Sequence, residues 1–238
     1  MSRAIDELIR RLPALDPCRA SIEDAIEILD ACLRRGGTVM VCGNGGSASD
    51  SEHLVADMMK GFLSRRPISA ADRARLQDAA GERGAAIADA LQGGLAAIAL
   101  ATEGALATAI ANDIRFDLVF AQQVHVLGRA GDVLVAISTS GSSANVVNAA
   151  HVARSRGLAV VALTGRDGAD IAGVADVAIR VPADRTFEIQ ELHMPVYHAI
   201  ALALEERFFP DAPAGAGARA AADRVAGTER ASTNRGEP

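Results

Sequence analysis

Apolar residues near the start of the chain recur at helical spacing. One set is Ile5, Leu8, Ile9 and Leu12, and a second is Ile22, Ala25, Ile26 and Leu29. This spacing predicts amphipathic helices over residues 2–12 and 21–34. Ser21 is expected to cap the second helix, and Gly36-Gly37 to end it.

Further along, five short apolar runs alternate with helical patterns. The runs are rich in Val, Ile, Leu and Ala and show no clean apolar–polar alternation, which is typical of parallel strands buried on both faces. The chain is therefore expected to fold as an α/β protein, with a doubly wound five-stranded parallel sheet flanked by helices. Ligands of such sheets bind at the carboxyl ends of the strands. The predicted strands are 38–42, 95–100, 132–138, 158–164 and 177–181, and the predicted helices 47–62, 104–127, 143–156 and 187–208.

Two segments depart from this alternation. Residues 63–92 are polar and stand between the first helix after the sheet begins and the second strand. They are read as a partly helical insertion in a single domain spanning 1–210, and a solvated surface excursion is favoured over a lid or an oligomer contact. Residues 211–238 are rich in Ala, Gly, Pro and Arg, which predicts a disordered tail.

Composition narrows the function classes. Half of the 238 residues are hydrophobic, the net charge is -6, and the chain has no Trp and one Tyr. Stacking platforms for bases are therefore missing, which argues against nucleic acid as a direct ligand. No apolar run is long enough to span a membrane, and no signal peptide is recognised. The three cysteines have no paired spacing, so a reducing cytoplasm is expected.

A glycine-rich turn follows the first predicted strand, in the stretch Gly43-Asn44-Gly45-Gly46-Ser47. Backbone amides at a helix N-terminus bind anions without a lysine. The turn also fits the loose dinucleotide pattern, but the acidic residue that should end a second strand about 20 residues on is missing. A Walker-type loop would need Gly-Lys-Ser/Thr, which is absent. An anion other than a dinucleotide is therefore favoured.

A second polar turn follows the strand at 132–138. It reads Ser138-Thr139-Ser140-Gly141-Ser142-Ser143 and holds five hydroxyls in six residues. An ordinary turn with a Ser cap would need only one of them. Hydroxyls and amides together can surround a phosphate monoester, so a phosphate site is predicted here.

Candidate metal and proton-transfer groups lie on two predicted helices. His53 and Asp57 are four residues apart and share a helix face, while Gln190 and His198 lie roughly two turns apart on the last helix. His, Asp and the Gln carbonyl oxygen can ligate a borderline divalent metal. Spacing alone favours the plainer alternatives, a surface His–Asp pair and a satisfied core histidine.

Four motifs in order resemble the sugar isomerase (SIS) domain family, whose members hold phosphosugars in such a Ser/Thr loop. Within that family the resemblance is closest to the phosphoheptose isomerases, and it covers about residues 1–208, with 63–92 as an added segment. The motifs are CGNGGSASDSEHLVADM, AIANDIRFDLVFAQQV, ISTSGSSANVV and IQELHMPVYH.

The resemblance implies a set of roles. The implied reaction converts D-sedoheptulose 7-phosphate to D-glycero-D-manno-heptose 7-phosphate through an enediol, for nucleotide-activated heptose synthesis, in a homotetramer with active sites at subunit interfaces. Zinc would bind His53, Asp57, Gln190 and His198, with Asp57 and His198 moving the proton. His193 is a second-choice ligand, and His125 and His151 receive no role. Substrate contacts are assigned to Asn44, Gly45, Gly46, Ser47, His53, Asp57, Asn112, Asp113, Ser138, Thr139, Ser140, Ser143 and Gln190.

One position departs from the family pattern. Asp57 stands where these enzymes usually have Glu, and its carboxylate lies one methylene nearer the helix. A misplacement of about 1 Å can cost on the order of 100-fold in rate. Two alternatives therefore stay open. One is a relative that binds the replication initiator instead of catalysing, and the other is an SIS isomerase for a different phosphosugar.

Overall fold

The computed structural model describes residues 2–100 and 104–210. They divide into two compact units, the first holding the described residues up to Met59 and between Leu95 and Leu204, the second Lys60–Gly94 and the described residues from Glu205 to Pro210. The tail predicted at 211–238 lies outside the described residues. The prediction of a single domain over 1–210 stays a prediction.

The first unit is built on a five-stranded sheet in which every neighbouring pair of strands is parallel, as predicted. The order is β2-β1-β3-β4-β5. All residues of the central strands β1 and β3 are buried, which explains their unbroken apolar sequences. The strands are β1 (Val39–Gly43), β2 (Ala97–Ala99), β3 (Val133–Ile137), β4 (Ala159–Thr164) and β5 (Val177–Arg180).

Helices occupy the predicted places with three differences. The first concerns the start of the second helix, which begins at Arg19 because the 3-10 turn at Pro13–Cys18 leads into it. Ser21 therefore lies inside the helix and donates its hydroxyl to the Cys18 carbonyl, so the predicted cap is wrong. The end is as predicted, since Gly36 takes a φ of 75° after the C-cap. These first elements are α1 (Arg3–Arg11), η1 (Pro13–Cys18) and α2 (Arg19–Arg34).

The other two differences lie further along. The helix predicted over 104–127 is two helices, because the chain turns extended at Arg115, with a φ of -166°, between them. The helix α8 (Ala169–Val174) was not predicted, since six residues are too few to show a helical period. The remaining helices are α3 (Gly46–Met59), α5 (Gly104–Asp113), η2 (Phe116–Leu118), α6 (Val119–Leu127), α7 (Ala144–Ser155) and α9 (Thr186–Phe208), of which α9 belongs to this unit up to Leu204.

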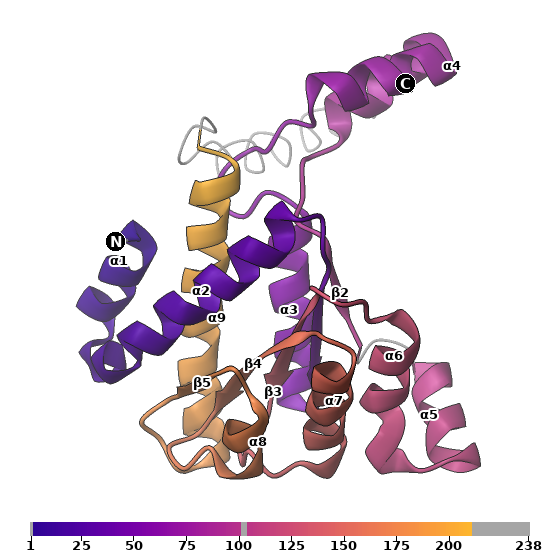
Figure 1. Ribbon diagram of the computed structural model, residues 1–238. Helices are drawn as coiled ribbons and strands as arrows, with labels where there is room; N and C mark the ends of the chain where they lie inside the picture. The colour runs from indigo at the N-terminus through magenta and orange to yellow at the C-terminus, as the bar shows by residue number, and fades with distance from the viewer. Residues whose placement is uncertain (1, 101–103, 211–238) are drawn as a thin grey trace, which may run out of the picture. The chain divides into compact units, whose positions relative to one another are not determined.

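The sheet is covered on both faces (Figure 1). On one face α6, α7 and α8 pack over Met40, Cys42, Leu134 and other alternate strand residues. The small residues Ala149 and Ala153 of α7 are fully buried there and let the helix approach closely. Helices α2 and α3 pack on the other face, and α9 runs beside them. The sheet is thus the middle layer of three, as a doubly wound fold requires.

The strand order places the candidate loops together. From β1 the chain passes through α3 to β2 on one side, whereas β3 lies on the other side of β1 and continues to β4. This reversal is a topological switch point, where open α/β sheets hold their ligands. Gly43 pairs with Ile137 at the ends of these two strands. The glycine-rich turn and the Ser/Thr turn therefore leave the sheet next to each other.

The second unit contains the polar insertion. Its helix α4 (Ala70–Ala90) is capped by Ser69, which accepts a hydrogen bond from the Asp72 amide, and is interrupted at Gly81. The segment is partly helical, as expected, and most residues of α4 are exposed in the single chain. The preference for a solvated excursion over a lid or an oligomer contact stays a prediction. No helix among the described residues is long and apolar enough to cross a membrane.

Candidate active site

A cavity lies at the carboxyl ends of β1 and β3. Its volume is about 270 Å³, room for a phosphate group and adjoining atoms. Both predicted turns contribute to its wall, together with the start of α9. The lining residues are Asn44, Gly45, Gly46, Ser47, Ile137, Ser138, Thr139, Ser143, Thr186 and Gln190.

Three helices begin at this cavity. Gly46 starts α3, Ser143 is the N-cap of α7, and Thr186 starts α9. Helix N-termini carry partial positive charge and unpaired amides, so three together favour an anion. None of the described residues that line the cavity is Lys or Arg. The wall therefore supplies amides and hydroxyls in place of formal charge.

The Ser/Thr turn is held in shape by its own hydrogen bonds. The Ser138 hydroxyl donates to Ser143 Oγ over 3.1 Å and accepts from the Gly141 amide over 3.1 Å. Gly141 has a φ of 71°, and a Cβ there would collide with the Gly168 carbonyl. Ser140 instead caps the Ser142 amide and lies outside the cavity lining. Its predicted substrate contact is therefore not supported by this wall and stays a prediction.

Two of the cavity's features were missed in the sequence. Asn145, 3% exposed, bonds to Asn44 through both side-chain amides, and Thr186 lines the cavity from α9. Asn145 could not be found from local spacing, because Asn44 lies 101 residues away in the chain. For Thr186 the sequence offers one local signal, a hydroxyl at the start of an apolar helix.

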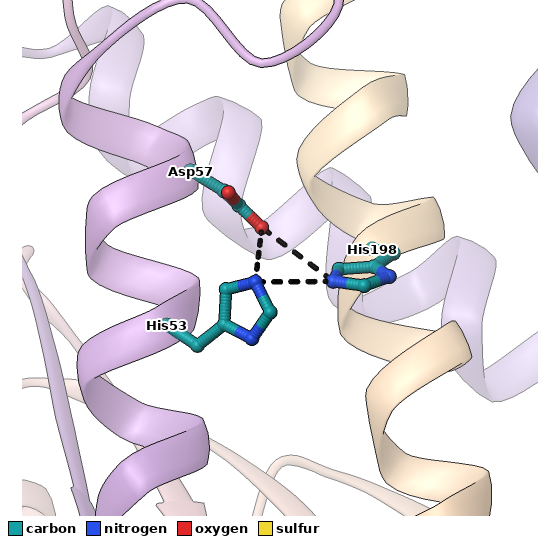
Figure 2. Close-up of side chains that lie close together, drawn as sticks. All are labelled: His53, Asp57 and His198. Atoms are coloured by element: carbon teal, nitrogen blue, oxygen red, sulfur yellow. Dashed lines mark hydrogen bonds and ion pairs between the residues drawn. The ribbon is translucent and has the colours of Figure 1, made fainter.

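A second cluster lies further along α3 and α9. Figure 2 shows His53, Asp57 and His198 pointing toward one another from the two helices. Asp57 Oδ2 is 3.7 Å from Nε2 of each histidine, and the two Nε2 atoms are 3.4 Å apart. Asp57 is buried, whereas the side chains of His53 and His198 are 44% and 29% exposed. Three of the four predicted metal ligands are thus brought together.

The donor triangle has the size that a metal site needs. A tetrahedral ion with bonds of about 2.0–2.1 Å holds its ligand atoms about 3.3–3.4 Å apart. In the described part of the chain, one candidate ligand atom from each residue lies within 4.8 Å of the others. Imidazole nitrogens with a carboxylate oxygen are ordinary ligands of borderline divalent metals. The group can hold such an ion, and the shorter Asp57 side chain does reach the histidines.

The protonation state of His198 also suits a ligand. Burial lowers the pKa of His198, against the opposing effect of the Asp57 carboxylate. A neutral imidazole keeps a lone pair for a metal or for a proton.

Gln190 and His193 occupy different surroundings from the triangle. The Gln190 amide packs directly against Gly46 and lines the cavity, so it lies with the phosphate turns. His193 is fully buried against the backbone of Thr164, and burial lowers its pKa to about 4. It does not belong to the metal group among the described residues, so it serves as a core residue here.

The remaining predicted residues lie apart from the cavity. Asn112 and Asp113 end α5, are both exposed, and bond to each other over 2.8 Å. Neither lines the cavity described above, so their sugar contacts stay predictions. His125 and His151, to which no role was assigned, are exposed on α6 and α7.

Comparison with known proteins agrees with this geometry. The model of the SIS domain family matches residues 4–93 and 77–165. Over 204 residues the chain is 39% identical to the phosphoheptose isomerase of Laribacter hongkongensis, covering 84% of this chain and 91% of that one. The chain belongs to the phosphoheptose isomerase family of SIS-domain proteins. The fold and the family predicted from the four motifs are thereby confirmed.

Solved structures of the phosphoheptose isomerase family superpose on the chain. The enzyme from Neisseria gonorrhoeae is 40% identical, with a TM-score of 0.66. The enzyme from Francisella tularensis is 28% identical, with a TM-score of 0.68. Each comparison covers 84% of this chain and 94% of the other.

Proposed function

We propose that the chain is an aldose–ketose isomerase that converts D-sedoheptulose 7-phosphate to D-glycero-D-manno-heptose 7-phosphate. The observation that carries this proposal is the arrangement of two sites along one pair of helices. The phosphate-type cavity lies at the start of α3 and α9, and the donor triangle lies further along both.

The distance between the cavity and the donor triangle favours a long phosphosugar as the substrate. From Gly46 to His53 the helix α3 advances about 10 Å at 1.5 Å per residue, and α9 advances about 12 Å from Gln190 to His198. An extended seven-carbon sugar phosphate has a comparable reach. Its phosphate would lie among the helix N-termini while C1 and C2 approach the triangle.

Phosphate binding needs no lysine in this arrangement. The start of α3 at Gly46 and Ser47, together with Ser138 and Ser143, lines the cavity and would offer amides and hydroxyls to the phosphate. They would orient the substrate and leave the sugar carbons free to lie along the helices. Gln190, placed between cavity and helix, would contact the sugar chain.

Zinc is proposed as the ion of this site, because two imidazoles and a carboxylate form a donor set that suits it. His53, Asp57 and His198 would hold it, whereas Gln190, the fourth ligand implied by the resemblance, lies with the phosphate turns, so its bond to the ion stays a prediction. Bound zinc supplies Lewis-acid polarisation of a carbonyl oxygen.

Asp57 and His198 are proposed to move the proton between C1 and C2. Aldose–ketose interconversion removes a proton from one of these carbons and returns one to the other through an enediol. Asp57 has two carboxylate oxygens and His198 two ring nitrogens, so each has a second atom beside the one facing the triangle. The buried Asp57 carboxylate and the neutral His198 are suited to accept and return that proton.

Product formation from the purified chain tests the proposal. Proton NMR should show the heptose aldose appearing from D-sedoheptulose 7-phosphate, more strongly with added zinc. A six-carbon ketose phosphate should turn over more slowly, because it spans less of the distance between the sites. Absence of aldose with and without zinc would overturn the proposal, and faster turnover of the shorter sugar would reassign the substrate.

Self-association as a homotetramer is proposed as well. Phe187 and Met194 lie on α9 and are 53% and 44% exposed, although both are large and apolar. Exposed apolar side chains on one element are typical of a surface that another subunit covers. Sedimentation should give four chains per particle, and Met194→Asp should yield smaller particles. A monomer at all concentrations would refute this assembly.

A further inference from the structure

Tyr197 occupies a position that the proposed reaction leaves unexplained. It is the one tyrosine of the chain, it is fully buried, and it precedes His198 on α9. Its hydroxyl donates to Asp50 Oδ1 over 3.2 Å and lies 3.0 Å from Nδ1 of His53. It therefore links a carboxylate of α3 to one of the candidate metal ligands.

The single proton of the Tyr197 hydroxyl determines which group donates in each of these two hydrogen bonds. A phenol has a single proton, and here that proton points to the Asp50 carboxylate, which can only accept. The second contact of the hydroxyl must therefore be an acceptance from His53 Nδ1–H. A neutral imidazole with its proton on Nδ1 carries its lone pair on Nε2. Nε2 is the atom that faces Asp57 and His198.

Helical spacing aligns the three groups. Asp50 and His53 are three residues apart on α3, so both side chains lie on one face, and Asp57 follows one turn later. Tyr197 reaches this face from α9. Its ring also contacts both imidazoles edge to face, with centroids 5.5 Å from His53 and 5.0 Å from His198.

We propose that Asp50 and Tyr197 form a positioning relay that holds His53 as the Nδ1–H tautomer, with Nε2 presented to the metal. The inference rests on the metal site of the proposed function. Groups behind a metal-ligating histidine commonly fix its tautomer and ring orientation, and their loss typically lowers metal affinity 10–100-fold. Asp50 and Tyr197 have this relation to His53, although neither faces the triangle.

A purely structural hydrogen bond would behave differently. Asp50 is 9% exposed, and its Oδ2 has no hydrogen-bond partner among the described residues. The hydrogen bond to Tyr197 is therefore the main interaction that stabilises the Asp50 carboxylate at this buried position. If the bond only satisfied a buried phenol, removing the hydroxyl would alter stability and leave the tautomer of His53 unchanged.

The first test reads the tautomer in the metal-free protein. Nitrogen-15 NMR of labelled histidine distinguishes a protonated Nδ1 from a lone-pair Nε2. The wild type should show His53 with the proton on Nδ1, and Tyr197→Phe, which keeps the ring, should shift His53 toward a mixture. A wild-type His53 protonated on Nε2, or an unchanged spectrum in Tyr197→Phe, would overturn the relay.

The second test reads metal affinity by competition with a chelator. Tyr197→Phe should weaken zinc binding 10–100-fold, and Asp50→Asn should weaken it by less, because the amide oxygen can still accept from the phenol. Ser51→Ala is the matched control. It deletes another buried hydroxyl of α3, one that bonds to the Ser47 carbonyl, and should leave zinc affinity unchanged.

The two readouts separate this inference from the proposed function. A wild type that binds no zinc would refute the metal site, while the tautomer spectrum would still decide the relay. Equal zinc affinity in the wild type and Tyr197→Phe, in proteins that both bind zinc, would overturn the relay and leave the isomerase proposal standing. An equal loss of zinc affinity in Tyr197→Phe and Ser51→Ala would show that both substitutions merely destabilise α3. That result would also overturn the relay.

Discussion

Asn44 and Asn145 exchange two side-chain hydrogen bonds, of 2.9 and 2.8 Å, across the switch point of the sheet. Asn44 belongs to the turn after β1, and Asn145 to the first turn of α7 after β3. Each amide donates to the oxygen of the other, so the pair ties the two phosphate turns together. The shape of the cavity between those turns depends on this tie.

Replacing Asn145 should weaken substrate binding. Asn145→Leu removes both hydrogen bonds, each of which contributes about 1 kcal/mol. A loss of about 1–2 kcal/mol corresponds to roughly a 5- to 30-fold increase in KM for the phosphosugar, with a smaller change in kcat. Steady-state kinetics measures both. Asn148→Leu, in the same helix but bonded to Asp117, is the control and should leave KM near the wild-type value. An unchanged KM in Asn145→Leu would show that the tie does not shape the cavity.

Removing either proposed proton-transfer group should stop the reaction. Asp57→Ala and His198→Ala each delete one corner of the donor triangle and should lower kcat below detection while the circular dichroism spectrum is retained. Glu52→Ala, an exposed carboxylate beside His53 on α3, is the control and should stay active. Near-normal turnover in either purified variant would contradict these roles.

The variant Asp57→Glu tests whether the shorter side chain of Asp has the length that this site requires. Asp57 Oδ2 lies 3.7 Å from both histidine nitrogens, and the added methylene of Glu would move the carboxylate away from this position. A shift of about 1 Å in a catalytic group can cost on the order of 100-fold in rate. We therefore expect Asp57→Glu to reduce kcat, by less than Asp57→Ala does. An increase in kcat would show that the triangle is held too wide for Asp.

His193 should make stability depend on pH in a defined window. Burial lowers the pKa of His193 from 6.5 to about 4, so the unfolded chain binds the proton first as pH falls. The stabilisation is fully present above about pH 6.5 and is lost as the pH falls toward 4, by at most roughly 3 kcal/mol at 1.36 kcal/mol per pKa unit. Urea unfolding at several pH values measures it. His193→Gln should flatten this dependence, and an equally steep dependence in the variant would assign it to other groups.

Glu205 is expected to anchor the start of the inserted segment, which belongs to the second unit. Its carboxylate accepts from the amides of Phe62 and Leu63 and pairs with the fully buried Arg66 over 2.7 Å. Removing one partner of a buried ion pair costs about 3–5 kcal/mol. Glu205→Ala should therefore speed limited proteolysis within 62–94, whereas Glu206→Ala should not. Equal cleavage rates in wild type and Glu205→Ala would refute this anchor.

The sheet could be predicted from the sequence because its determinants are local. Val39 to Gly43 and Val133 to Ile137 are apolar on both faces, and the turn residues that follow each strand are recognisable one by one. The family motifs then located His53, Asp57 and His198, which the structure brings together.

The missed features depend on contacts between distant segments. Tyr197 meets Asp50 across 147 residues of sequence, and Asn145 meets Asn44 across 101. No periodicity reports such pairs. The cap predicted at Ser21 was wrong for a related reason, since the turn at Pro13–Cys18 starts the helix earlier than the capping residue suggests. The reach of Asp57 depends on how closely α3 and α9 pack, which spacing within one helix does not specify.

If Asp57 and His198 move a proton between C1 and C2 of a seven-carbon ketose phosphate, turnover in D2O must leave deuterium in the product. NMR of D-sedoheptulose 7-phosphate incubated with the protein in D2O measures this. We expect aldose carrying deuterium at C2 with the wild type, and no deuterium in sugar recovered from Asp57→Ala or His198→Ala. Wild-type protein that leaves the ketose unchanged and undeuterated, with zinc present, would contradict this proton transfer.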